Sequence, residues 1–97
     1  MSYRVNSNWN EKNEIRCLII LKKLQEANFP RGKQMEHCRE ISITANLDPT
    51  NISAKVSNFK SVAGINNYSN ASANTIEIFK KYGSFSIHEL KRIINER

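Results

Sequence analysis

A run of amide, hydroxyl and ammonium side chains in the middle of the chain has the chemistry and spacing to contact a nucleic acid. Asn51, Lys55 and Asn58 recur every three or four residues, which places them on one side of a helix. Asparagine can form two hydrogen bonds with adenine, lysine can reach guanine or a phosphate, and serine can bond either. Further polar residues flank this stripe and would assist it: Ser53, Ser57 and Lys60. The pattern predicts DNA binding by a helix over Pro49–Val62.

The charge balance favours a polyanionic partner. Fifteen Lys and Arg residues against nine Asp and Glu give a net charge of +6 and a pI near 9.6. Such an excess attracts polyanions and says nothing about fold, although it can also serve solubility alone. No acidic residue occurs between Pro49 and Ile76, so DNA could approach this stretch without repulsion. The residues expected to bind phosphates are Arg31, Lys33 and Lys60.

Helical elements must position these side chains. Asp48 and Pro49 have the residue types that cap and begin a helix, and Ile52, Val56 and Phe59 would give that helix its buried side. The other helices are expected from Asn10 to about Asn28, from Lys33 to Asn46, from Ser72 or Asn74 through Lys81, and from Ser86 onward. No internal repeat and no convincing strand pair is present. The sequence predicts an all-α fold of about five helices, compact and helix-turn-helix-like.

The chain length of 97 residues is that of a single domain. Residues 1–8 are polar and expected to be frayed, residues 65–71 form an Asn-rich loop, and residues 86–97 form the C-terminal helix. Between Cys17 and Leu21, apolar residues cover more than half of the circumference of the first helix. This breadth predicts a central helix that several others contact. That run is far shorter than the ~20 residues needed to span a membrane. With no secretory signal and two isolated cysteines, we predict a cytoplasmic protein with no membrane contact.

No residue pattern indicates catalysis. A zinc site needs four clustered ligands, but the four candidates fall on three predicted helices without ligand spacing: Cys17, His37, Cys38 and His88. A nucleophilic pair of Cys38 with His88 would need an oxyanion hole and an orienting acid, and neither is indicated. The three glycines are scattered and form no phosphate-binding loop. We therefore predict a binding module and not an enzyme, without catalytic residues, metal or cofactor.

Four segments of the sequence resemble a known domain. They are Trp9 with Glu11 and Glu14 ahead of an apolar helix, the stretch His37–Ser42, the stretch Asn51–Phe59, and Tyr68-Ser69 followed by Ile76–Phe79. Together they are similar to the N-terminal domain of HNH-type restriction-like endonucleases. The most specific match is the spacing of Ile52, Lys55, Asn58 and Phe59. The resemblance runs from Trp9 to Phe79, within a region 9–82.

Some positions depart from that family. Ile15 stands where the opening pattern has Leu, Ile76 replaces the usual Trp of the closing helix, and nothing supplies the HNH nuclease half. The resemblance implies a recognition part of a restriction–modification system, either a fragment or a free-standing relative, that binds double-stranded DNA, modified or unmodified. The alternative is a protein-interaction module, such as a small phage or mobile-element protein. It would use the same basic surface to bind and inhibit a host defence protein.

Overall fold

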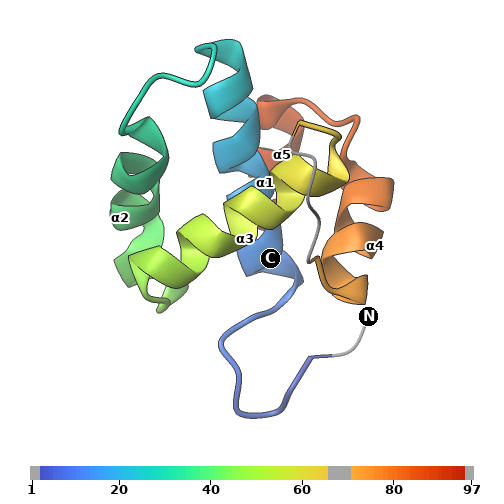
Figure 1. Cartoon of the computed structure of the whole chain (residues 1–97). Coiled ribbons are helices and arrows are strands. Elements are labelled where there is room, and N and C mark those ends of the chain that lie inside the picture. Colours follow the sequence, from blue (N-terminus) through green and yellow to red (C-terminus); the bar gives the residue numbers. More distant parts are fainter. Residues whose placement is uncertain (1–2, 66–70, 96–97) are drawn as a thin grey trace.

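A computed structural model of the chain describes residues 3–65 and 71–95 (Figure 1). Its helices are α1 (Glu11–Glu26), α2 (Lys33–Ala45), α3 (Pro49–Val62), α4 (Ala73–Tyr82) and α5 (Ile87–Asn95). No strand occurs in these described ranges. The predicted all-α class with about five helices is confirmed.

Side-chain caps fix where α1, α3, α4 and α5 begin. Asp48 accepts a hydrogen bond of 2.8 Å from the backbone N–H of Thr50, and Pro49 occupies the first helical position, where its missing N–H has no cost. The helix continues to Val62, and Gly64 follows in the left-handed region at φ 81°. The predicted range of this helix is confirmed. The other side-chain caps are Asn10 for α1, Ser72 for α4 and Ser86 for α5.

Helix α1 is the centre of the molecule, as its broad apolar surface predicts. Each of the other four helices contacts it, and α3 crosses over it with α2 on one side and α4 on the other (Figure 1). The residues from Cys17 to Leu21 are all 5% exposed or less. Burial of this helix on several sides therefore holds the domain together. The buried core consists of Ile15, Cys17, Leu18, Ile19, Ile20, Leu21, Leu24, Cys38, Ile52, Val56, Phe59, Ile78, Tyr82 and Leu90.

Helices α2 and α3 form a tightly connected pair. The turn between them consists of Asn46, Leu47 and Asp48. Asn46 adopts the left-handed conformation at φ 56° and ψ 48°, which ends α2 and redirects the chain. The Ser42 hydroxyl then donates a hydrogen bond of 2.6 Å to the Leu47 carbonyl and fixes the turn. The pair has the connectivity of a helix-turn-helix.

The N-terminal segment differs from the prediction of fraying. Tyr3–Asn8 folds back on the domain, with the Tyr3 hydroxyl bonded to a carboxylate of α1. The backbone N–H of Ser7 bonds the Arg4 carbonyl at 3.1 Å, and the Asn8 amide donates to the Asn46 carbonyl at 3.0 Å. The partners of Tyr3 and Asn8 lie outside the segment, which is why its polar composition gave no sign of them.

Two predictions on the remaining segments have limited outcomes. The Asn-rich loop over 65–71 and the Tyr68-Ser69 part of the resemblance fall largely on residues 66–70, which lie outside the described residues, as do residues 1 and 2. Within the described part of the chain, no helix has the length and apolar character needed to cross a membrane.

Candidate nucleic-acid interface

The buried side of α3 is the apolar stripe predicted from its spacing. Ile52, Val56 and Phe59 are each fully buried, and they belong to the same core cluster as the residues of α1. Because the three side chains repeat at helical spacing, they fix how α3 is rotated about its own axis. The prediction for these three residues is confirmed.

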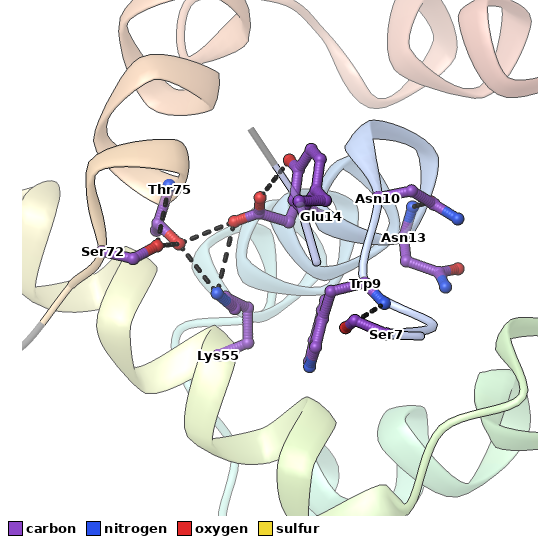
Figure 2. A network of polar contacts seen from close by, with 9 residues as sticks. Ser7, Trp9, Asn10, Asn13, Glu14, Lys55, Ser72 and Thr75 are labelled. Atoms are coloured by element: carbon purple, nitrogen blue, oxygen red, sulfur yellow. Dashed lines mark hydrogen bonds and ion pairs between the residues drawn. The ribbon is translucent and has the colours of Figure 1, made fainter. Parts of the chain in front are cut away.

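Lys55 belongs to a buried polar network between α1, α3 and α4 (Figure 2). Its ammonium lies 3.4 Å from Oε1 of Glu14 and donates a hydrogen bond of 3.0 Å to Oγ1 of Thr75. Thr75 in turn donates to the same Glu14 oxygen at 2.6 Å. The ring centroid of Trp9 lies 4.7 Å from the Lys55 ammonium, a cation–π contact. Glu14 and Thr75 are fully buried, and the Lys55 side chain is only 15% exposed.

This network corrects the prediction that Lys55 faces solvent in acid-free surroundings. The acid comes from α1, because Glu14 lies outside the acid-free stretch between Pro49 and Ile76. A phosphate or base would have to displace Lys55 from a buried carboxylate, which would then lack its countercharge. We therefore remove Lys55 from the expected DNA contacts. A signal was present in the sequence, because Glu14 shares helical spacing with the buried Leu18 and Leu21.

A second network occupies the opposite flank of α3, where Gln34 of α2 is the central residue. Its amide nitrogen lies 2.9 Å from the Ser53 hydroxyl and 3.2 Å from the Ser57 hydroxyl, and it also reaches the Ser53 carbonyl at 3.0 Å. The Lys60 ammonium donates to the Gln34 carbonyl oxygen at 2.5 Å and lies 5.4 Å from the Phe29 ring centroid. Ser53, Ser57 and Lys60, which the sequence predicted as DNA contacts, are all half-buried. Ser53 and Ser57 therefore hold α2 against α3, a structural role that the sequence did not predict.

The side of α3 that remains accessible is rotated away from Lys55. At 100° per residue it lies opposite Ile52 and Val56. Its N-terminal half is exposed and its C-terminal half is half-buried. We call it the open face of α3, and it consists of Thr50, Asn51, Ala54, Asn58 and Ser61. Of the predicted stripe, only Asn51 and Asn58 belong to it.

The open face carries no charged side chain, but a carboxylate stands at its N-terminal end. Asp48 is exposed, and it accepts hydrogen bonds from the backbone and the hydroxyl of Thr50 at 2.8 and 2.5 Å. These bonds lower the pKa of Asp48 below its ordinary value. The carboxylate therefore stays ionised at neutral pH and disfavours a phosphate at this helix N-terminus. A carboxylate at this place suits an exposed base amino group, such as that of cytosine.

Three predicted phosphate-binding cations gather near the C-terminal end of α3. Arg31 and Lys33 are exposed in and after the loop that joins α1 to α2. Lys60 reaches the Phe29 ring of the same loop. Lys33 forms an ion pair of 3.0 Å with Glu36, and both side chains are about half exposed. Such a pair contributes little to stability, so a phosphate could replace the carboxylate.

A cavity of about 320 Å³ lies on the other side of α3, beside the Glu14–Lys55 pair. The N-terminal segment forms one wall and the start of α4 forms another. Sequence reasoning missed this cavity, because it expected residues 1–8 to be frayed. The lining residues are Tyr3, Arg4, Ser7, Trp9, Glu14, Lys55, Ser72 and Asn74.

The residues considered for catalysis differ in their exposure. Cys17 and Cys38 are free and buried, and burial raises the pKa of both thiols, which keeps them protonated. His88 is exposed on α5, whereas Cys38 is buried on α2. Among residues 3–65 and 71–95, no group of three or more His, Cys, Asp and Glu side chains could hold a metal ion.

Comparison with known proteins adds no relative: no family model, no curated protein and no solved structure matches the chain. The resemblance to the N-terminal domain of HNH-type restriction-like endonucleases stays a prediction based on its motifs. The function of the chain is therefore inferred from geometry and charge.

Proposed function

We propose that this protein is a binding module for double-stranded DNA, without catalysis of its own, that contacts base pairs with the open face of α3. The observation that carries the proposal is the α2–α3 pair. A short turn joins the two helices. The second helix leaves the N-terminal half of an uncharged polar face exposed, while its other sides are packed. In helix-turn-helix proteins the second helix enters the major groove with its N-terminal residues at the base edges.

The N-terminal half of the open face has suitable chemistry for base edges. Asn51 can donate and accept hydrogen bonds with adenine, and the methyl groups of Thr50 and Ala54 can contact the methyl group of thymine. Asn58 lies two turns further along the helix and would contact a base or the backbone. The small size of Ala54 allows close approach of the helix to the groove floor.

The cations near the C-terminal end of α3 would supply the electrostatic attraction to the DNA backbone. Arg31, Lys33 and Lys60 would bind phosphates, and each contact should add about 0.9 to the slope of log affinity against log salt. The net charge of +6 would add non-specific attraction at low salt. Ser53 and Ser57 act indirectly in this proposal, because they fix the position of α2 relative to α3.

A charge placed on the open face tests the proposal. Ala54 is exposed, and glutamate is nearly as good a helix former as alanine, so Ala54→Glu should fold normally. It should weaken duplex binding by about tenfold or more, because it sets a carboxylate against base edges and phosphates. The matched control is Gln25→Glu, which adds the same charge at an exposed position near the end of α1. Fluorescence anisotropy with labelled duplex at two salt concentrations measures both variants.

The same titration decides between the proposed contexts. Tighter binding of methylated or of unmodified duplex would support a recognition part of a restriction–modification system acting in the cytoplasm. A wild-type chain with no affinity for duplex at low salt contradicts DNA binding. If that chain instead co-purifies with a protein, the alternative of an inhibitor of a host defence protein replaces the proposal.

A further inference from the structure

The N-terminal segment is anchored at both ends. At one end the Tyr3 hydroxyl donates to the Glu14 carboxylate. At the other end the Asn8 amide donates to the Asn46 carbonyl at 3.0 Å, and the Asn8 carbonyl accepts from the amide of Asn13 at 2.7 Å. The bonds tie the segment to α1 and to the turn of the helix-turn-helix.

Between these anchors the chain makes a turn whose side chains contact little of the protein. The backbone N–H of Ser7 bonds the Arg4 carbonyl at 3.1 Å and closes the turn. Arg4, Val5 and Asn6 are exposed at its tip, and Val5 is 100% exposed. A fully exposed valine contributes no burial energy to this fold. Because hydrogen bonds hold this turn and both ends of the segment, a partner that binds it should lose less conformational entropy.

The turn lies beside α3, on the flank of Asn51 and Asn58. The Trp9 ring that follows the turn rests against Lys55 (Figure 2), and Arg4 lines the same cavity as Lys55. No acidic residue occurs in residues 1–10. Among the residues that line the cavity, Glu14 alone has a carboxylate, and it is fully buried and paired with Lys55. Glu11 and Glu77 lie near enough to Tyr3 to act on its hydroxyl electrostatically, but neither lines the cavity. A duplex that meets the open face of α3 therefore also meets a cationic and apolar turn at its edge.

From this placement we infer that the turn Arg4–Val5–Asn6 inserts into the DNA minor groove next to the major-groove segment contacted by α3. The inference rests on the proposed function. A terminal arm beside a major-groove helix can reach the adjacent minor groove. There an arginine is attracted by the negative potential of narrow A·T tracts, and an apolar side chain can wedge against the base edges. Arg4 and Val5 supply these two groups.

Two duplexes separate the minor groove from the major groove. Inosine–cytosine pairs present the same major-groove edges as guanine–cytosine pairs, but they lack the guanine amino group that obstructs the minor groove. If the turn inserts, the wild-type chain should bind an inosine-substituted duplex about tenfold more tightly than its guanine counterpart. Helix α3 alone cannot produce this difference by direct contacts, because its major-groove contacts are the same in both duplexes.

Arg4→Ala tests whether the turn is the source of the preference. Arg4 is exposed, so the variant should fold normally, and it should bind both duplexes alike after losing about tenfold for the inosine duplex. The matched control is Lys91→Ala, which removes one positive charge from an exposed position of α5. It should keep the ratio of the two affinities.

The outcomes separate this inference from the proposal on which it rests. Equal binding of the two duplexes by the wild-type chain, or an unchanged preference in Arg4→Ala, would overturn minor-groove insertion and leave DNA binding by α3 intact. Failure of the wild-type chain to bind either duplex at low salt would overturn both.

Discussion

Removal of either partner of the Glu14–Lys55 pair should destabilise the domain strongly, and removal of both should not add the two costs. Breaking a buried ion pair by losing one partner costs about 3–5 kcal/mol. Lys55→Met should lie at the upper end, because the Glu14 side chain is fully buried and would keep its charge without its countercharge. Glu14→Gln should lie at the lower end. The Lys55 side chain is 15% exposed, and a lysine can extend its ammonium toward solvent.

The double variant Glu14→Gln plus Lys55→Met carries neither charge, and its glutamine oxygen can still accept from the Thr75 hydroxyl. It should cost no more than the costlier single variant, so the coupling energy should be at least the smaller single cost, about 3 kcal/mol. Domains of this size have about 5–15 kcal/mol of total stability, so the single variants should be compared at low temperature. Urea unfolding followed by helical circular dichroism measures each free energy of unfolding.

Two results would refute this reasoning. Additivity of the two single costs within about 0.5 kcal/mol would show that the ammonium and the carboxylate do not interact. A Lys55→Met variant as stable as the wild-type chain would show that Lys55 has no structural role. The DNA titration gives an independent check, because folded Lys55→Met should keep the wild-type salt slope. If Lys55 instead binds a phosphate, the slope should fall by about 0.9.

Three further predictions concern local features. Hydrogen bonds from Thr50 lower the pKa of Asp48. The contribution of Asp48 to stability is therefore present above the ordinary aspartate pKa of 3.8 and is lost as the pH falls below that value. Over that pH range, the difference in urea midpoint between the wild-type chain and Asp48→Ala should shrink. Gly83→Ala would bring a methyl group against the carbonyl oxygen of Phe79, and calorimetry should show a loss of about 1–3 kcal/mol. The Cys17 thiol is fully buried with a raised pKa, so a thiol reagent should modify it only as fast as the domain opens, and rapid labelling of the native chain would contradict its burial.

The helices could be predicted from sequence because the interactions that define them are local. Asp48 and Pro49 are adjacent, and the apolar residues of α3 repeat within a few turns, so the sequence predicted its range from Pro49 to Val62. The central place of α1 followed from the breadth of its apolar surface. These features depend on neighbours within about one or two helical turns.

The N-terminal turn could not be predicted in this way. A short polar segment looks frayed when its composition alone is considered. Its order depends on contacts with Glu14 and Asn46, which folding brings close to Tyr3 and Asn8. The sequence shows the donors and acceptors but does not show that they meet.

The exposure of α3 shows most clearly which features the sequence determines and which depend on tertiary contacts. Sequence alone determined that a helix with Ile52, Val56 and Phe59 inside would present polar residues elsewhere on its circumference. Only the tertiary structure decided which of those residues meet solvent, because Glu14 and Thr75 approach from one flank and Gln34 from the other. A helical pattern fixes the middle of the buried side, whereas the neighbouring helices determine how far burial extends around it. Lys55 lies at the edge of the buried side, and its ion pair with Glu14 of α1 keeps its ammonium inside the protein.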